Sequence, residues 1–429
     1  MIKVLNSLNC TKSELLSRAT PESPEVDSVV LGIINDVITN GDKALFEYAK
    51  RFDKACLSVL EVSREEIDTA LSRVDDYFIQ TLNQAKANIE AFHTKQKREG
   101  FMLGNVGDAK ALGQRVLPLE RVGIYVPGGT ASYPSTVLMN AIPARIAGVS
   151  EIIMVTPPCS DGSVKDEILA AASIAGVDRI FKIGGAGAVA ALAYGTESVP
   201  AVDKIVGPGN VFVATAKRMV FGKVAIDMVA GPSEILIIAD KTANPSFVAA
   251  DLLSQAEHDR LASSVLITDC EGLAKDVVKE LDKQLTELAR EDIARTSIEN
   301  NGKIIIVRDI DEAIELSNGY APEHLELAVE APFAILDKVK HAGSIFMGHY
   351  TPEPLGDYFA GTNHTLPTSG TARFSSPLGV DDFVKRSSYI MYNKNALENV
   401  SERVADFAER EGLTAHANSI LIRFKGEGE

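Results

Sequence analysis

The segment SQAEHD, residues 254–259, carries side chains that can bind a metal ion. Asn244-Pro245 is typical of a helix cap followed by a first-turn proline, and the Ala- and Leu-rich run after it predicts a helix through this segment. Because a helix repeats every 3.6 residues, Gln255 and His258 should share one face, with Asp251 a turn earlier. An imidazole beside carboxylate or amide oxygens suits zinc. The alternative is a solvated helix end with a surface histidine.

The segment NGYAPEHLEL, residues 318–327, carries an adjacent carboxylate and imidazole. Asn318-Gly319 is typical of a helix end, and Pro322 fixes the chain before a predicted strand. Glu323 and His324 should therefore stand at the mouth of that strand. A neighbouring Glu and His shift each other's pKa and commonly move protons near neutral pH. The pair predicts acid–base chemistry, although a dipeptide alone is a weak signal.

A third segment, residues 350–376, is rich in Gly, Pro, Ser and Thr and is expected to be a loop. It carries Asp357 and His364. Long ordered loops in compact enzymes are more often functional than decorative. We expect this loop to contribute to a functional site, with His364 as a further polar contact of unassigned role.

The composition limits the classes of partner. A chain of 429 residues with 45% hydrophobic content should bury a large core and divide into several domains. Its net charge of -16 and pI near 5.0 oppose binding to nucleic acid or an anionic membrane. The four scattered cysteines form no CxxC motif, which argues against a disulfide framework or a thiolate zinc site. Without a signal-peptide core or a long apolar run, the chain is expected to be cytoplasmic.

Short apolar runs alternate with helical segments from Val116 onward. Such alternation predicts parallel sheets covered by helices. The similar segments IAGVSEIIMV and IAGVDRIFKI support a repeated strand–helix unit. The first 100 or so residues and the charged tail after Arg386 are expected to be helical. Strands are expected at VGIYVPGG, EIIMVTPP, RIFKIGG, KIVGPG, EILIIAD, SVLITD and KIIIVRD.

The segment IGGAGAVAA has the spacing of a dinucleotide-binding loop. Gly185, Gly187 and Ala190 follow a predicted strand as GxGxxA, and Asp203 lies further along. Such glycines bring backbone amides and a helix N-terminus close to a pyrophosphate. Small residues at this spacing also serve tight packing of a helix on a strand, so both interpretations stay open.

Seven segments, in the same order, make the chain similar to histidinol dehydrogenases, the zinc- and NAD-dependent enzymes that complete histidine biosynthesis. They are RVGIYVPGG, KIVGPGN, DMVAGPSEI, LLSQAEHD, YAPEHLEL, GDYFAGTNHTLPTSGTARFSS and EGLTAHANS. The resemblance implies an α/β fold of two Rossmann-like parallel-sheet domains, with a helical N-terminal segment and a small helical C-terminal tail domain. We expect an N-terminal arm at 1–23, a metal-carrying domain at 24–125 and 235–378, a cofactor domain at 126–234, and a tail at 379–429.

The resemblance implies one Zn²⁺ per subunit, held by Gln255, His258, Asp357 and His416. An amide oxygen is an unusual zinc ligand, so the role of Gln255 rests on the resemblance. The tail that carries His416 is expected to come from the partner in a homodimer with shared active sites. Substrate contacts are expected from Ser233, Gln255, His258, His324, Asp357, Glu411 and His416.

The implied reaction is a four-electron oxidation of L-histidinol to L-histidine by way of histidinal, with two NAD. His324 would take the hydroxyl proton during hydride transfer, and Glu323 would then activate water for attack on the aldehyde. NAD contacts are expected from Tyr125, Gly187 and Asn210. Relatives commonly carry a glutamine where this chain has Gly187, so backbone or water would make that contact.

Two other activities fit parts of the pattern. A related zinc dehydrogenase could act on another polyol or a sulfonated alcohol, but the Glu411 carboxylate suits an ammonium group and repels a sulfonate. A metal-dependent hydrolase could use His258, Asp357 and Glu323 to activate water without nicotinamide. Only the dehydrogenases would generate NADH from substrate and NAD.

Overall fold

The structure is a computed structural model that describes residues 1–18, 24–128 and 132–425. Residues 19–23 of the expected N-terminal arm and Gly129 of the RVGIYVPGG segment lie outside the described residues. The fold is α/β, as predicted. Chain contacts divide it into a first unit of residues 1–97 and 119–383 and a second unit of residues 98–118 and 384–429.

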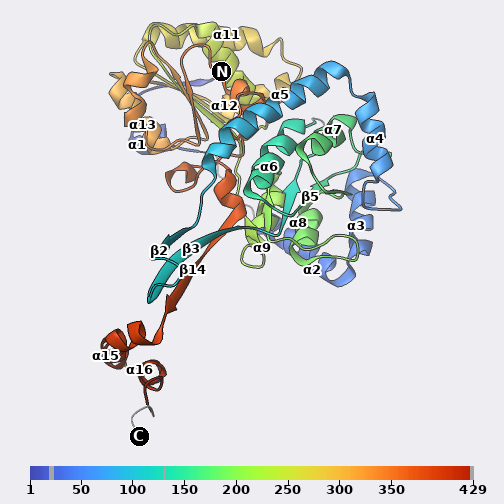
Figure 1. The fold of residues 1–429 in the computed structure, drawn as a ribbon. Coiled ribbons are helices and arrows are strands. Elements are labelled where there is room, and N and C mark those ends of the chain that lie inside the picture. The colour runs from blue at the N-terminus through green and yellow to red at the C-terminus, as the bar shows by residue number, and fades with distance from the viewer. Residues whose placement is uncertain (19–23, 129–131, 426–429) are drawn as a thin grey trace. The chain divides into compact units, whose positions relative to one another are not determined.

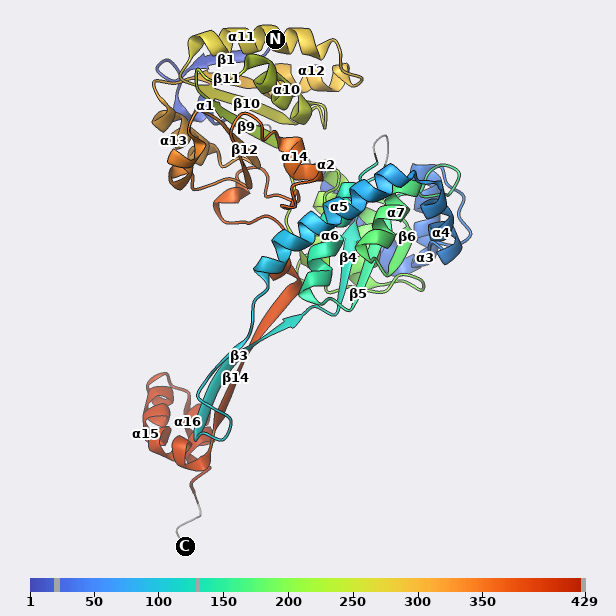
Figure 2. The same cartoon turned by 45° about the horizontal axis from the view of Figure 1, so that its top comes forward.

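A six-stranded parallel sheet runs through part of the first unit (Figure 1, Figure 2). Its order is β1-β11-β10-β9-β12-β13. Its central strands are continuous apolar runs because both faces are covered. The strands are β1 (Lys3–Asn6), β9 (Glu234–Ala239), β10 (Ser263–Thr268), β11 (Lys303–Ile306), β12 (His324–Ala328) and β13 (Ser344–Met347).

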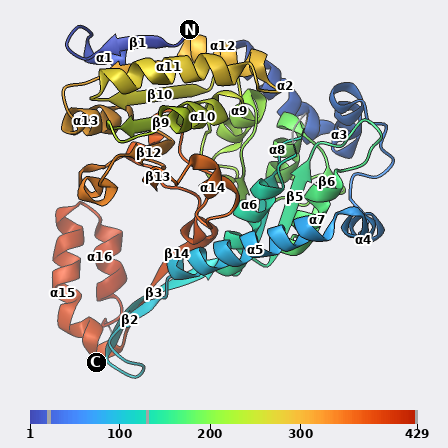
Figure 3. The same ribbon diagram turned by 90° about the horizontal axis from the view of Figure 1, so that it is seen from above.

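Helices cover both faces of this sheet (Figure 3). One of them contains Gln255, and another leads to Glu323. One face is covered by α10 (Pro245–Ala256), α11 (Glu271–Leu285) and α12 (Glu291–Asn301), and the other by α1 (Lys12–Leu15) and α13 (Ile310–Tyr320). Asn244 caps α10, as predicted, because its side chain accepts a hydrogen bond from the backbone N–H of Ser246.

Two predicted helix ends are wrong. Helix α10 ends at Ala256, so Gln255 and His258 do not share a helical face; the N–H of His258 instead donates to the carbonyl of Gln255 at 3.2 Å in a turn. Helix α13 continues through Asn318-Gly319 to Tyr320. It ends at Ala321, which adopts the left-handed conformation with φ of 52°.

A five-stranded parallel sheet forms the other part of the first unit, in the order β6-β5-β4-β7-β8. Its strands are β4 (Arg121–Tyr125), β5 (Glu151–Thr156), β6 (Arg179–Lys182), β7 (Lys204–Val206) and β8 (Ala225–Ile226). One face packs against α2 (Pro24–Asn40), α3 (Asp42–Tyr48), α8 (Gly185–Tyr194) and α9 (Val211–Val220), and the other against α4 (Arg64–Arg73), α5 (Asp76–His93), α6 (Pro134–Ala147) and α7 (Asp166–Ala175). All seven predicted strands are present across the two sheets.

The N-terminal region is helical from residue 24 to residue 93, apart from short connections, but its first strand was not predicted. Strand β1 pairs in parallel with β11 at the edge of the six-stranded sheet. Helices α2 to α5 pack on the five-stranded sheet. The expected domain of residues 24–125 and 235–378 stays a prediction. Its first part contributes to the five-stranded sheet and its covering helices, whereas its second part forms most of the six-stranded sheet.

The second unit combines an antiparallel ribbon with a helical hairpin. Its elements are β2 (Phe101–Leu103), β3 (Lys110–Pro118), β14 (Val384–Tyr392), α15 (Lys394–Arg410) and α16 (Thr414–Leu421). The predicted helical tail is confirmed by α15 and α16, but it does not begin directly after Arg386, because β14 pairs with β3 as far as Tyr392. A largely exposed strand lacks the apolar alternation that would have revealed it.

Short elements complete the first unit. They are a π-helical turn (Ala49–Asp53), 3-10 turns (Thr94–Gln96, Pro332–Ala334, Leu336–Lys338, Thr371–Arg373 and Val380–Phe383) and α14 (Glu353–Tyr358). Helix α14 interrupts the segment 350–376, which was expected to be a loop throughout. Within the described ranges, none of the helices combines the length and apolar character needed to cross a membrane.

Candidate functional site

Glu323 and His324 lie at the start of β12, as predicted, and the neighbouring strand β9 holds both side chains. The backbone N–H of Glu234, the first residue of β9, donates to Oε2 of Glu323 at 2.7 Å. The carbonyl of the same residue lies 2.9 Å from Nδ1 of His324. A carbonyl can only accept, so Nδ1 carries the proton in this contact. Nε2 of a neutral His324 is then free to accept a proton.

Helix α14 brings two carboxylates to that nitrogen. Nε2 of His324 lies 3.7 Å from Oδ1 of Asp357 and 3.8 Å from Oε1 of Glu353. Ligand atoms of these three side chains lie within 4.8 Å of one another, close enough to share a cation. Sequence analysis missed Glu353, although it stands one helical turn before Asp357 on the same face.

Burial and mutual charge shift the pKa of each of these groups. Burial raises the pKa of Glu323 to about 8, against the opposing effect of His324. Burial lowers the pKa of His324, but the carboxylates of Glu323, Asp357 and Glu353 together raise it to about 10. Burial and the nearby Asp357 raise the pKa of Glu353 to about 8. Burial opposes ionisation of Asp357, but His324 and His364 lower its pKa to about 2. The pKa values of Glu323 and Glu353, both about 8, lie near neutral pH, so these two groups can exchange protons there.

Gln255 fits a metal ion for a reason that is visible in the structure. Its side chain is 1% exposed, and Oε1 is buried without a hydrogen-bond partner among the described residues. A buried amide oxygen without a donor is costly, whereas a cation would satisfy it. His258 follows after the helix and is solvent-exposed, yet neighbouring atoms restrict hydration of its ring and lower its pKa, while the Asp357 charge raises it.

Two further predicted residues lie beside this cluster. Ser233 immediately precedes β9, and its carbonyl accepts a hydrogen bond from the N–H of Ser263 at 3.0 Å. His364 contacts the backbone carbonyl of Asp357 through Nδ1 at 3.0 Å and Thr136 Oγ1 through Nε2 at 3.4 Å. His364 thus fixes the end of α14 and connects it to helix α6.

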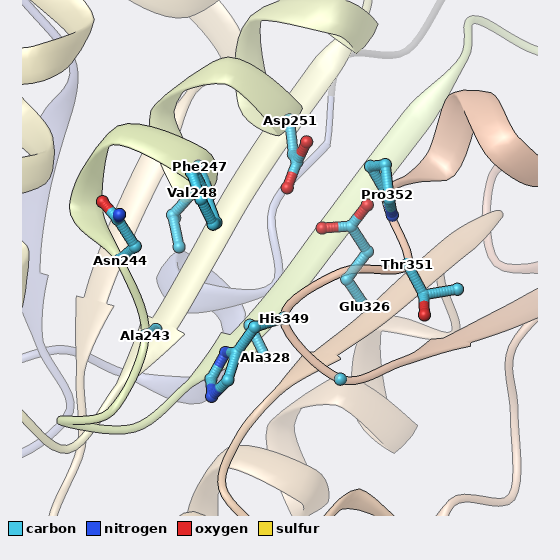
Figure 4. A pocket seen from close by; sticks show the side chains of 11 residues that line it. Ala243, Asn244, Phe247, Val248, Asp251, Glu326, Ala328, His349, Thr351 and Pro352 are labelled. Carbon is cyan, nitrogen blue, oxygen red and sulfur yellow. The ribbon is translucent and has the colours of Figure 1, made fainter.

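A second pair of acids lies further along β12 (Figure 4). Glu326 accepts the backbone N–H of Glu353 at 2.8 Å, and its carboxyl group faces that of Asp251. Burial raises the pKa of Asp251 to about 6, although its contact with Glu326 lowers it. Burial and then the charge of Asp251 raise the pKa of Glu326 well above its usual value. The adjoining cavity of about 10 Å³ holds about one water molecule, too little for a substrate.

Glu411 and His416 belong to the second unit. Glu411 directly follows α15, His416 lies in α16, and both side chains are exposed. They are available on the surface of the helical hairpin for contact with a ligand or another chain. Their predicted place in the metal and substrate site stays a prediction.

The predicted cofactor residues lie at the carboxyl ends of strands in the five-stranded sheet. Tyr125 ends β4, and its hydroxyl accepts the N–H of Gly185 at 3.0 Å, at the start of α8. Asn210 caps α9 and accepts the N–H groups of Phe212 and Val213. Gly187 lies inside the first turn of α8, where an added Cβ would stand 3.3 Å from the ring of Tyr48. Position 187 therefore faces helix α3.

The loop between β7 and α9 passes very close to Tyr125. Gly207 has φ of 110°, and a Cβ there would lie 2.2 Å from the carbonyl oxygen of Tyr125, so only glycine fits. Its N–H donates to Asp227 at 2.8 Å and its carbonyl accepts Nζ of Lys217 at 2.9 Å. Lys217 and Asp227 also form an ion pair and are only 2% and 1% exposed. This buried pair fixes the loop from both sides.

Asp203, the acidic residue that follows the GxGxxA segment, binds backbone groups. Its Oδ2 accepts the backbone N–H groups of Glu120 and Arg121, each at 3.1 Å, and so ties β7 to the start of β4. The GxGxxA spacing nevertheless places a glycine-rich helix start, at Gly185, beside the end of β4. Close approach of a ligand to backbone amides is therefore possible there.

Comparison with known proteins assigns the chain to a family. The sequence profile of the histidinol dehydrogenases matches residues 16–424. Histidinol dehydrogenase of Clostridium acetobutylicum is 56% identical over 411 residues, covering 96% of this chain and 95% of that protein. Histidinol dehydrogenase of Listeria monocytogenes is 54% identical over 98% of this chain and 99% of that protein. The crystal structure of histidinol dehydrogenase from Elizabethkingia anophelis is 40% identical, with a TM-score of 0.93, and covers 100% of this chain and 99% of that one. The chain therefore belongs to the histidinol dehydrogenase family.

Proposed function

We propose that this protein oxidises L-histidinol to L-histidine in two successive steps, using two NAD and one Zn²⁺ per subunit. As a member of its family it is an oxidoreductase of histidine biosynthesis. The observation that carries the proposal is the clamp of Glu323 and His324 by the backbone of Glu234, beside Asp357. It provides two proton-accepting groups at one point, as an alcohol oxidation followed by hydration of an aldehyde requires.

Each base has a separate role. His324 takes the proton of the substrate hydroxyl on Nε2, because Nδ1 is engaged with the carbonyl of Glu234. Glu323 takes a proton from the water that adds to the aldehyde. The pKa of Glu323, raised to about 8, lies close enough to neutral pH for the group to release and accept a proton during the reaction. Neutralisation of Asp357 by a cation would lower the pKa of His324 toward the same range.

The proposed metal ligands are Gln255, His258, Asp357 and His416. The orphaned Oε1 of Gln255 and the charged Asp357 support such a site. When bound, zinc would hold the imidazole and amine of the substrate, and NAD would accept hydride. Glu353 adds a carboxylate that can pair with the substrate ammonium, and the remaining proposed substrate contacts are Ser233 and Glu411.

The deciding experiment measures NADH absorbance with L-histidinol, a neutral polyol or a sulfonated alcohol as substrate. We expect NADH only with the amino alcohol, at two NADH for each histidine formed. Dialysis against a chelator should remove the activity, and zinc should restore it. Release of product without NADH would support a hydrolase and contradict the proposal.

We also propose that the protein is a homodimer in which the tail, residues 379–429, supplies Glu411 and His416 to the partner's site. Two inactive proteins, His258→Ala and His416→Ala, are mixed under conditions that allow exchange of subunits. A shared site gives the heterodimer one intact centre, and activity returns toward half. If every tail serves its own subunit, each site keeps one lesion and the mixture stays inactive.

For the cofactor, we propose that Tyr125, Gly187 and Asn210 lie at the NAD site. The close packing of Gly207 on Tyr125 and the exposed position of Asn210 at the start of α9 support this location. Gly187 would contribute backbone only. NAD binding is measured by fluorescence titration, and Asn210→Ala should weaken it while leaving zinc content unchanged.

A further inference from the structure

Arg18, in the N-terminal segment, contacts Glu234 of β9, the residue whose backbone binds the side chains of Glu323 and His324. Its Nε donates to Oε1 of Glu234 at 2.7 Å, and its Nη2 donates to Oε2 at 3.1 Å. The two side chains are 20% and 4% exposed. A bidentate guanidinium–carboxylate pair has a fixed geometry, and burial makes that geometry costly to change. Arg18 therefore fixes the position of Glu234 in two directions.

Glu234 is the residue whose backbone holds both proton-transfer groups. Its N–H binds the carboxylate of Glu323, and its carbonyl binds the imidazole of His324. A movement of Glu234 would consequently displace both side chains together. No hydrogen bond joins Arg18 to either group, so any effect that it has on the reaction passes through the residues that it contacts, Glu234 among them.

Arg18 also contacts the turn that leads into β12. Its guanidinium lies 3.7 Å from the centroid of the Tyr320 ring, and its Nη2 lies 3.3 Å from the carbonyl oxygen of Ala321. Ala321 has a left-handed backbone, which is strained for a non-glycine residue and persists only where neighbours hold it. Ala321 precedes Glu323 by two residues. Arg18 thus supports the approach to Glu323 as well as its partner on β9.

We propose that Arg18 is a positioning residue for the oxidation, acting through Glu234 and Ala321 on Glu323 and His324. The inference rests on the proposed roles of those two residues. It assigns a function to the N-terminal segment, which contributes to the reaction without reaching the substrate.

The chain offers a matched control in Arg179. This arginine forms the same bidentate pair with Glu61, at 2.7 Å and 2.8 Å, and its guanidinium lies 4.9 Å from the centroid of the Phe181 ring. The pair stands at the five-stranded sheet, away from Glu323 and His324. The Arg179 and Glu61 side chains are more exposed, 31% and 38%. Loss of Arg179 therefore removes an ion pair of the same geometry without removing support from the proposed proton-transfer residues.

The test compares Arg18→Met with Arg179→Met. We expect Arg18→Met to lower kcat roughly 10- to 100-fold for both histidinol and histidinal, because small misplacements of reacting groups are costly. The KM for NAD and the zinc content should stay within about twofold of wild type. Arg179→Met should keep kcat within about twofold. Equal kcat for the two variants would overturn the proposal.

Two further variants separate positioning from stability. Arg18→Lys keeps the charge but loses the planar fork and should lower kcat about 5- to 10-fold while the protein stays folded; wild-type kcat in this variant would contradict positioning. Arg18→Met/Glu234→Gln removes both buried charges, so thermal stability should recover while kcat stays low. Recovery of kcat together with stability would show that Arg18 has only a structural role.

Glu323→Gln, measured in the same assays, distinguishes failure of the positioning role of Arg18 from failure of the proposed role of Glu323. Slow oxidation of histidinal by Glu323→Gln together with normal kcat in Arg18→Met would reject the positioning role alone. Wild-type histidinal oxidation by Glu323→Gln would instead reject the proposed role of Glu323 itself.

Discussion

The two parallel sheets place their candidate sites at opposite ends of their strands. In the five-stranded sheet, Tyr125 ends β4 and Asn210 follows β7, and the chain order reverses between these two strands. This is the usual binding position in open α/β sheets. In the six-stranded sheet, Glu234 and Glu323 stand at the amino ends of β9 and β12. The rule that locates ligands in such folds therefore finds one region and misses the other.

The chemistry of the candidate sites at the two sheets also differs. The six-stranded sheet gathers buried titratable groups with shifted pKa values around His324. At the five-stranded sheet the buried charges, Lys217 and Asp227, neutralise each other and support a glycine backbone. One end is suited to moving protons and the other to close contact with a flat or phosphorylated ligand. Mutations at the two ends should consequently have separable effects.

The largest effect is expected at the proton-transfer pair. Glu323→Gln keeps the size of the side chain but removes a base, so histidinal oxidation should slow by about two to four orders of magnitude. His324→Asn should slow the oxidation of both histidinol and histidinal. Stopped-flow measurement of NADH formation checks both, and fluorescence titration should show unchanged NAD affinity. Weakened NAD binding in either variant would contradict the separation of the two ends.

The next effect is expected at the buried ion pair. Asp227→Asn leaves Lys217 buried with an uncompensated charge and should lower the free energy of unfolding by about 3–5 kcal/mol, with weaker NAD binding. Lys217→Met/Asp227→Asn should recover part of the stability. Denaturant unfolding and NAD titration measure these changes. Zinc content is the control, and its loss would show that the two ends are coupled.

A smaller, pH-dependent effect is expected from Asp251. Its folded pKa, about 6, lies above the unfolded value, so the folded protein retains a proton that the unfolded chain releases. Stability from this group is present at low pH and is lost as pH rises through about 6. Between pH 5 and pH 7 the free energy of unfolding of wild type should fall by on the order of 1 kcal/mol relative to Asp251→Asn. A constant difference would contradict the raised pKa of Asp251.

The smallest effect is expected at Gly187. In Gly187→Ala the gain in helix propensity, up to about 1 kcal/mol, is opposed by the approach of the new Cβ to Tyr48 at 3.3 Å. Thermal unfolding should change by less than about 1 kcal/mol, and NAD affinity should hardly change. Gly185→Ala is the matched control, since φ of 62° there makes any side chain strained. Equal stability of the two variants would contradict the assigned backbone roles.

Strands and covering helices could be predicted because buried parallel strands are continuous apolar runs, as in β9 and β10. Strand β14 could not, because its exposed residues show no apolar alternation. Position in the sequence also predicted Glu323 and His324 at the start of β12. It did not predict the clamp by Glu234, since that contact depends on the register of β9 against β12.

Glu353 shows a signal that sequence reasoning could have used. It lies one helical turn before Asp357, but the Gly- and Pro-rich surroundings favoured a loop over a helix. The end of α10 illustrates the opposite error, because a helical pattern was extended past Ala256 to His258. Helix boundaries depend on tertiary contacts that a single sequence does not reveal.

The hydrogen bonding of β12 has a consequence for motion during turnover. This strand is paired with β9 on one side and β13 on the other, so its amides exchange with solvent only when much of the sheet opens. Helix α14, which carries Glu353 and Asp357, has just six residues. We therefore expect slow hydrogen exchange in β12 and fast exchange in α14. Entry and departure of ligands would then deform the helix, while the strand that leads from Glu323 and His324 keeps its place.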